Sequence, residues 1–545
     1  MKKTIKIGII AIVIVFGTFK ILEWVLESKF ERLINSKPDR DYNITYEDFA
    51  LSTFFSGITL NNVSITPFNK TEGTIINGTV DYAELTGFAW SKYLFSKSLE
   101  VDGIQFNYPK FNINVVEDTL LKAETKKNNN LTLQALFSDI LSRADLSEFQ
   151  INDGSIIVKE ADSLIKGEVH HINLLASGIE IDSLKLTNII PFKLDNLEVD
   201  IDSMSYQINS YTKARLGSLD YRMAERSIKI KDVSLNYEKD WVEISKERGV
   251  QDDVIEFDLK AISISGLEYT SSFWTNLDIK AHKMEIDSFS LSMKRNKNLK
   301  RPKDEKKALF KGMVDKIPYS IDLDSINISN SKILYGELSK GHQSTGIIEI
   351  NAINGSITDF STFPERQIEL GAFKADLTAR LNDAADMSIN MEVPYDKDTF
   401  SLHTTLNNMN MAALSPSLVP LLGIEIDQGY LKRFDFRMNA SYYGSQNALI
   451  MDYDDLHLTV YEQDDDGSQH KKDLFSSLAN VAIRHHNLPG ERHYLTANYR
   501  TERNIYRSPF QHIVAGALDG VKHIVPARGL QSIFNRKGKV KKKRR

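Results

Sequence analysis

The sequence predicts a mainly β protein, built on a long antiparallel or mixed sheet that is apolar on one face and polar on the other. From about Asp41 onward, apolar residues recur at every second position, which is the period of a half-buried strand. Helical periodicity is confined to a few short stretches. A recurrent motif also interrupts the alternation at regular points along the chain.

In this motif, two alternating apolar residues are followed by a polar pair and then by two more apolar residues. Asn-Asn, Asp-Gly, Asp-Ser, Lys-Asp and Ser-Gly fill the polar pair. A two-residue insertion resets the parity of a strand. The pair is therefore either a tight hairpin turn or a bulge that bends one long strand, and both keep the apolar residues on one side of the sheet. The motif occurs at 58–65, 101–106, 179–186, 192–199, 201–206, 228–235, 262–269, 284–291 and 321–328.

Helices are expected at 131–143, at 304–316, at 474–483 and at 509–525. The last is the most regular, because Ser508 suits the N-cap, Pro509 suits the first helical position and Pro526 ends the pattern. The Lys- and Arg-rich segment 296–311 is expected to be a flexible excursion.

An unbroken apolar run occupies residues 7–19, with Lys2, Lys3 and Lys6 before it and Lys20 after it. With its flanks to Leu26 the run approaches the ~20 residues that a membrane helix needs. A cleaved signal peptide is the alternative, but no small-residue cleavage site follows the run. The positive-inside rule places the N-terminus in the cytoplasm and the remainder outside it. We therefore predict three parts: an anchor at 1–27, an exported elongated β domain at 28–508, and an amphipathic helix with a basic tail at 509–545.

Composition sets further limits. Of the 545 residues, 41% are hydrophobic and 26% are charged, as in ordinary folded proteins. Because cysteine is absent, disulfides, thiolate metal sites and cysteine nucleophiles are excluded. The net charge is −5, yet the last ten residues carry +8, so the remaining residues carry −13 (−5 less 8). An acidic body thus ends in a basic tail.

We find no motif for catalysis or for a cofactor. Phosphate-binding glycine loops, nucleophile elbows and zinc-protease motifs are missing from the sequence. His485, His486 and His493 are the best metal candidates, but adjacent strand residues point to opposite faces, so solvated histidines are favoured. The run 464–467 has half of a calcium loop without its closing glutamate and is interpreted as a hairpin tip. We expect a protein that is not an enzyme and holds no metal or cofactor.

An ordered series of further patterns follows the anchor. It comprises Phe54-Phe55-Ser-Gly-Ile58, Leu85-Thr-Gly-Phe88-x-Trp90, Leu99-x-Val101-x-Gly-Ile104-x-Phe106-x-Tyr108-Pro109, Phe149-x-Ile151-x-Asp-Gly154, Met411-Ala-Ala-Leu414-Ser-Pro416, Leu421-Leu-Gly423-Ile-x-Ile426-x-x-Gly429 and Leu478-Ala-Asn480. Spread over nearly the whole chain, the series resembles the AsmA-like envelope proteins of the AsmA/TamB/DUF748-type superfamily.

The resemblance implies an inner-membrane anchor with the bulk of the chain in the periplasm, and a long curved sheet that forms a hydrophobic groove. It also implies a role in moving phospholipid across the envelope of double-membraned bacteria. It brings no catalytic residues with it.

Two functions therefore stand side by side. The first is a lipid conduit or carrier, because the predicted helices are too small to cover the apolar face, so that acyl chains, a second sheet or closure of the sheet must cover it. The second is a non-enzymatic envelope scaffold or outer-membrane assembly factor with a self-packed core. The candidate lipid-facing residues are Ile104, Phe106, Leu184, Leu186, Leu197, Val199, Val233, Leu235, Leu267, Tyr269, Phe289, Leu291, Ile326 and Ile328.

The C-terminal helix and tail are expected to touch a surface. The helix is too short to span a bilayer, so its apolar stripe either caps the sheet or lies on a membrane, and the eight-charge tail favours a membrane. Anionic lipid, and no nucleic acid, is the expected partner of the tail. The candidate membrane-surface residues are Phe510, Ile513, Val514, Leu518, Val521, Lys541, Lys542, Lys543, Arg544 and Arg545.

Overall fold

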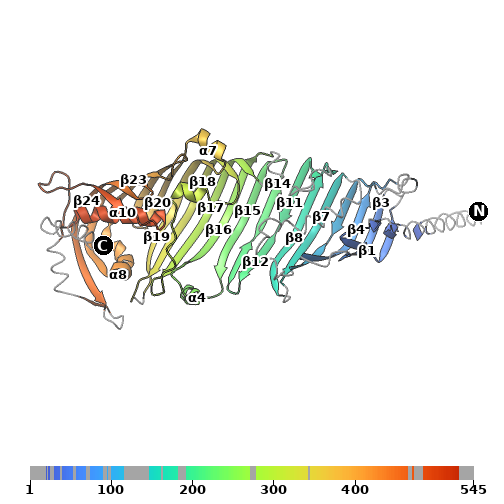
Figure 1. Ribbon diagram of the computed structural model, residues 1–545, viewed down its shortest axis with the longest axis horizontal. Helices are drawn as coiled ribbons and strands as arrows, with labels where there is room; N and C mark the ends of the chain where they lie inside the picture. The colour runs from blue at the N-terminus through green and yellow to red at the C-terminus, as the bar shows by residue number, and fades with distance from the viewer. Residues whose placement is uncertain are drawn as a thin grey trace, which may run out of the picture. The chain divides into compact units, whose positions relative to one another are not determined.

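The protein is mainly β, as predicted, and it divides into two compact units (Figure 1). The first comprises Met1–Asp232 with Glu268–Asp278, and the second comprises Val233–Leu267 with Ile279–Arg545. We describe each unit by itself. The computed structural model describes residues 20, 23–24, 27, 30–32, 34–36, 38, 40–52, 57–68, 74–89, 95, 100–115, 147–160, 164–181, 192–269, 278–341, 344–463, 469–471 and 483–526.

The sheet of unit 1 is mixed. Its pairings are antiparallel except where β5 and β6 run parallel to β7. The strands are β1 (Tyr42–Thr45), β2 (Asp48–Leu51), β3 (Gly57–Pro67), β4 (Thr74–Thr86), β5 (Gly103–Asn107), β6 (Lys110–Val115), β7 (Glu148–Lys159), β8 (Ile165–Ser177), β11 (Asn196–Ile201), β12 (Ser203–Asn209), β13 (Thr212–Leu216), β14 (Ser218–Arg222) and β15 (Ser227–Tyr237), with a small separate pair β9 (Glu180–Ile181) and β10 (Phe192–Lys193). Strands β1 to β8 enclose a buried core to which Phe30 and Ile34, before the first strand, contribute.

A line of bends crosses the sheet of unit 1. Asn62 in β3, Tyr108 between β5 and β6, Asp153 in β7, His171 in β8 and Asp232 in β15 all have φ of 50–54°. Tyr108, Asp153 and His171 lie at neighbouring positions of the paired strands β5 to β8, and β5 and β6 pair with β7 in the same register on both sides of Tyr108. The left-handed conformation is one that Asn and Asp tolerate best, and it produces a bulge that bends a strand. We call this line the crease.

The crease decides between the two interpretations of the sequence motif. The pairs 61–62, 231–232, 265–266, 287–288 and 324–325 all lie inside unbroken strands. At 202–203 the chain passes from β11 to β12, yet both strands pair with β8 in one continuous register. At these positions the polar pair therefore lies within a continuous run of strand and is not a hairpin turn. Asn62, Asp232, Gly266 and Ser288 supply a left-handed residue in four of the pairs. The pair 182–183 lies outside the described residues.

Unit 2 is also a mixed sheet, in which the long strands β17 and β18 run parallel and the other pairings are antiparallel. Its crease passes through Ser288, Asn330 and Ala352, with φ of 55°, 50° and 48°. The strands are the end of β15, β16 (Asp253–Leu267), β17 (Ile279–Asn296), β18 (Ile321–Leu338), β19 (Gly346–Ser361), β20 (Ala372–Leu381), β21 (Ala385–Pro394), β22 (Phe400–Asn410), β23 (Ile424–Ser441), β24 (Gly444–Gln463), β25 (Gln469–Lys471) and β26 (Ala497–Glu502).

Helices cover the C-terminal strands of unit 2. The predicted C-terminal helix is α10 (Pro509–Ile524), and the Ser508 side chain caps it by accepting a hydrogen bond from the Gln511 amide. It packs on β23, β24 and β26 (Figure 1) and buries Phe436, Met438 and Tyr499 in a second core. The other helices are α4 (Trp241–Arg248), α6 (Phe310–Val314), α7 (Pro364–Leu370) and α8 (Ser415–Leu422), with a short 3-10 turn at Met411–Leu414.

The other expected helices and the N-terminal anchor are either shorter than predicted or lie outside the described residues. Only Phe310–Val314 of the expected helix 304–316 is helical, and 301–309 is not. The expected helix 131–143 lies outside the described residues, as do nearly all of 474–483 and the anchor 7–19. In the part of the chain that is described, no helix has both the length and the apolar character needed to cross a bilayer.

Candidate functional site

An open apolar surface runs along the middle strands of unit 2. Register places Phe257 beside Leu291, Leu291 beside Ile333 and Ile333 beside Ile350, so these side chains share one face of four neighbouring strands. Beyond the crease, a second row joins Ile262, Ile286 and Ile328 in the same way. The bulge returns this row to the same face. We call these residues, with Phe289 and Ile348, the apolar strip.

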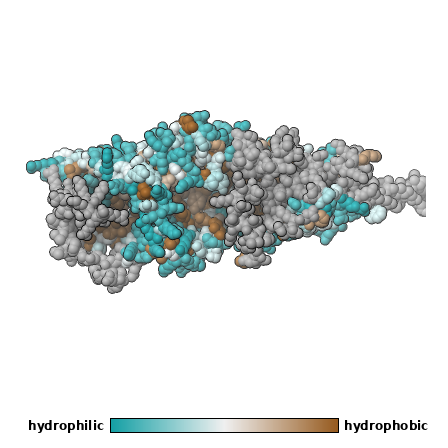
Figure 2. All heavy atoms as spheres, viewed as in Figure 1, coloured by the Kyte–Doolittle hydropathy of each residue, from teal (hydrophilic) through white to brown (hydrophobic). Residues whose placement is uncertain are grey.

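The side chains of the apolar strip are only half-buried. The contrast with the C-terminal strands is clear, because Phe436, Met438 and Leu449 beneath α10 are each 1% exposed. Figure 2 shows hydrophobic residues recessed between hydrophilic ones where β16–β19 lie in Figure 1. The strip is thus a face that the described helices leave open.

Unit 1 has an open apolar surface of its own on β12. Met204, Tyr206 and Ile208 alternate along this strand and are 41%, 42% and 47% exposed. Met204 lies between Val169 of β8 and Leu216 of β13. In the covered part of unit 1, by comparison, Ile65 and Ile76 are completely buried. Each unit therefore combines a closed core with an open apolar face.

The structure separates the predicted lipid-facing residues into three groups. Ile104, Phe106, Leu267 and Ile326 are buried in protein, so they are not available to a ligand. Leu184 and Leu186 lie outside the described residues. The half-buried remainder is Leu197, Val199, Val233, Leu235, Tyr269, Phe289, Leu291 and Ile328.

The prediction missed several residues of the open faces. Phe257 lies in the first half of β16, and Ile333, Ile348 and Ile350 lie beyond the crease in β18 and β19. The motif search did not reach them because each is distant from its strand's polar pair. Their signal is the plain alternation within the strand, but strand register is needed to place them beside Phe289 and Leu291.

The two faces of α10 have different surroundings. Ile513 and Val521 pack against the second core, and Gly516 and Gly520 let the helix approach the sheet closely. A Cβ at Gly520 would lie 2.3 Å from the Tyr499 hydroxyl. These contacts are those of a cap on the sheet, so Ile513 and Val521 do not lie on an exposed membrane-facing stripe.

A second stripe of α10 faces outward. Phe510, Val514 and Leu518 are 58%, 54% and 43% exposed. They keep the prediction of a membrane contact open for this stripe, although Phe510 also meets the Phe310 ring at 5.3 Å. The tail residues Lys541 to Arg545 lie outside the described residues.

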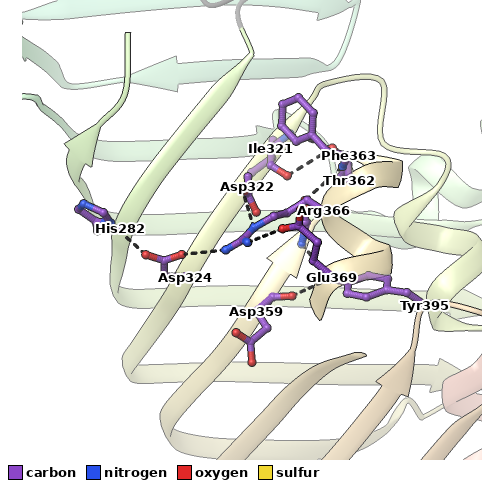
Figure 3. Close-up of polar contacts among 11 residues, drawn as sticks. His282, Ile321, Asp322, Asp324, Asp359, Thr362, Phe363, Arg366, Glu369 and Tyr395 are labelled. Carbon is purple, nitrogen blue, oxygen red and sulfur yellow. Dashed lines mark hydrogen bonds and ion pairs between the residues drawn. The ribbon is translucent and has the colours of Figure 1, made fainter. Parts of the chain in front are cut away.

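A polar network fastens α7 to the ends of β17 and β18 (Figure 3). Arg366 lies 3.4 Å from Asp322, 3.9 Å from Asp324 and 2.9 Å from Glu369. His282 meets Asp324 at 2.9 Å. Burial raises the pKa of the Asp322 carboxyl. Arg366 stands at the centre of this network with three carboxylates around it, and we assign the network the role of holding α7 in place.

The histidine candidates for a metal have other contacts. The His485 ring lies 4.4 Å from that of His457 in a tilted arrangement, and its Nδ1 contacts the Leu456 carbonyl at 2.6 Å. His486 contacts Asp454. Over the described ranges, no three His, Asp or Glu side chains converge on a point where a metal ion would bind. The predicted hairpin tip 464–467 lies outside them.

Comparison with known proteins leaves the resemblance to AsmA-like proteins as a prediction: no family model matches the chain, and no curated protein matches it either.

Proposed function

We propose that the protein binds lipid acyl chains on its open apolar faces, and that it carries or conducts phospholipid across a cell envelope from an anchor in the inner membrane. The observation that carries this proposal is the apolar strip. Phe257, Phe289 and Leu291 are half-buried in the middle of the sheet, whereas Phe436 and Met438 of the same unit are sealed beneath a helix.

An acyl chain suits such a surface for a simple energetic reason. Each methylene that leaves water for an apolar environment gains ~0.8 kcal/mol, so a chain laid along several strands gains several kcal/mol without any directed polar contact. The chain also covers side chains that otherwise face water. A surface that is apolar across several strands favours lipid over a small polar ligand.

The test is the lipid content of the purified full chain. Phe289→Asp and Leu291→Asp place a charge on the apolar strip, and Ser290→Asp places the same charge between them on the opposite face. We expect phospholipid in native mass spectra of the wild type and of Ser290→Asp, and a loss of at least tenfold in the other two, since an unpaired charge on an apolar surface costs more than 1.4 kcal/mol. Thermal unfolding of each variant shows whether it is still folded.

A wild-type protein free of lipid, or three variants with the same lipid content, contradicts the proposal. A lipid-free wild type instead favours the envelope scaffold.

A further inference from the structure

A basic segment crosses the apolar face of unit 2. Residues 297–309 leave β17 at Asn296, at the sheet edge where β18 ends and β19 begins. They lead into α6, where Phe310 packs on Phe400, at the start of β22. Register along β19, β20, β21 and β22 puts this start at the opposite edge of the sheet. Because Leu309 and Val314 join the core beneath the helices, the crossing is on the apolar side. We call 297–309 the basic strap.

The strap is held at both ends by hydrogen bonds, in contrast to the flexible excursion that the sequence predicted. Near its start, the Gln251 side chain donates to the carbonyls of Lys297 and Leu299, at 3.0 and 2.7 Å. Near its end, the Lys307 amide donates to the Ile505 carbonyl at 2.8 Å, and Arg503 donates to the Lys307 carbonyl at 2.8 Å. The turn at 503–508, which precedes α10, therefore lies against the strap.

The strap brings positive charge to the end of the apolar strip. Residues 297–307 include six Lys or Arg and two Asp or Glu, which gives a net charge of +4 in a chain whose total is −5. Arg295 of β17 and Glu337 of β18 lie side by side. Each stands two residues beyond a half-buried member of the apolar face, Met293 and Tyr335. The charged end of these strands thus continues the apolar surface.

Arg295, Lys297 and Arg301 each have a carboxylate partner, whereas Arg507 has none in the described ranges. Arg295 forms two hydrogen bonds to Asp253 at 2.6 and 2.8 Å. Lys297 lies 2.6 Å from Glu337, and Arg301 lies 3.2 Å from Asp304. The half-buried guanidinium of Arg507 forms neither an ion pair nor a side-chain hydrogen bond with any residue that the structure describes.

Arg503 donates hydrogen bonds to the carbonyls of both Lys307 and Arg507, at 2.8 and 3.4 Å, which places Arg507 against the positively charged strap. Burial, together with repulsion from Arg301 and Arg295, lowers the pKa of the Arg507 guanidinium. Arginine is effectively always protonated in proteins, so Arg507 carries a positive charge. An anion bound here would remove the repulsion and supply acceptors that the protein itself does not provide.

We propose that Arg507, with Arg301 of the basic strap, binds a phosphate group at the end of the apolar strip. A guanidinium presents two parallel N–H donors, which match two oxygens of a phosphate ester. The adjoining strip would take the acyl chains of the same molecule, so the ligand that fits both surfaces is a phospholipid. The lipid part of this inference rests on the proposed function, whereas the phosphate site also fits inorganic phosphate.

The experiment compares Arg507→Gln with Arg500→Gln in the full chain in detergent. Arg500 lies on the neighbouring strand β26, is exposed and donates a hydrogen bond to Gln446, so its replacement removes the same charge away from the strap. The probes are radiolabelled phosphatidylglycerol, diacylglycerol with the same acyl chains, and inorganic phosphate.

We expect Arg507→Gln to weaken phosphatidylglycerol binding about tenfold, the factor that a charge-assisted hydrogen bond supplies, and to leave diacylglycerol binding unchanged. Arg500→Gln should match the wild type. If inorganic phosphate raises the melting temperature of the wild type and not of Arg507→Gln, while both lipids bind alike in every variant, the site binds free phosphate and the headgroup is excluded.

If Arg507→Gln and Arg500→Gln have equal effects on phosphatidylglycerol binding and on the response to inorganic phosphate, the proposed phosphate site is wrong, even if both lipids bind. If neither lipid binds, the proposed function is wrong. The melting temperature with inorganic phosphate then still shows whether the phosphate site exists.

Discussion

The crease predicts that replacing Ala352 with glycine stabilises the protein, whereas glycine within a strand usually destabilises it. Ala352 has φ of 48° in the middle of β19. Its neighbours on the crease are Asn330 and Ser288, residue types that hydrogen-bond locally, whereas alanine has only a methyl group. Replacement by glycine therefore changes the backbone preference and very little else.

The magnitude follows from two opposing terms. The left-handed conformation costs an ordinary L-residue about 1–2 kcal/mol, and Ala352→Gly removes this cost. The greater conformational freedom of glycine in the unfolded chain offsets about 0.5–1 kcal/mol of this gain in stability. We expect Ala352→Gly to raise the free energy of unfolding by about 0.5–1 kcal/mol. Ala352→Val should lower it, because a β-branched side chain fits this conformation worst.

The matched control is Ala448→Gly. Ala448 lies in the regular part of β24, pairs with Arg437 and has no positive φ, so glycine there should cost about 0.5–1 kcal/mol. Urea unfolding of the full chain in detergent measures both variants, and hydrogen exchange of the β18 and β19 amides locates the effect within unit 2. Equal losses in the two variants would refute the left-handed assignment, and with it the crease at this strand.

Two further predictions concern the helices of unit 2. Burial lowers the pKa of His512, on the buried face of α10, to about 4 against an ordinary value near 6.5, with Arg503 and Asp519 as its charged neighbours. The stability that neutral His512 contributes is therefore complete above pH 6.5 and is lost as the pH falls towards 4, so the free energy of unfolding should drop by about 3 kcal/mol over this window. His512→Gln should flatten this pH dependence. An unchanged slope in the variant would contradict the lowered pKa of His512. Asp398 accepts hydrogen bonds from the amides of Leu309 and Gly312, at 2.9 and 3.1 Å, and so caps α6. Asp398→Ala should speed amide hydrogen exchange in α6 by the factor that corresponds to the loss of about 1 kcal/mol. Asp396→Ala, in the same loop, should leave the exchange rate unchanged.

The sequence predicted the mainly β architecture because the period of two is a local property that each strand carries by itself. The same holds for α10, whose Ser508 cap and Pro509 start are local signals. The crease was half visible: its Asn and Asp residues gave the motif, but the choice between a turn and a bulge depends on which strand lies opposite. Pairing at long sequence separation, such as that of β5 with β7, decides it.

The candidate site was harder to predict, because exposure depends on coverage. Phe106 and Leu291 occupy equivalent positions in the sequence pattern, yet Phe106 is 5% exposed within the core of unit 1 and Leu291 is only half-buried in unit 2. No local pattern tells the two apart. Arg507 was missed for the same reason, since only the folded chain places it against the basic strap.

The crease also explains how a strand as long as β17, with 18 residues, keeps one apolar face. Phe289 and Leu291 are odd-numbered and Met284 and Ile286 are even-numbered, so an uninterrupted pleat would turn one pair to the polar side. The left-handed residue Ser288 absorbs the change of parity, and Asn330 does so at the paired position of β18. The bends of β17 and β18 coincide, so the two halves of the apolar strip stay aligned between the crease and the charged edge at Arg295.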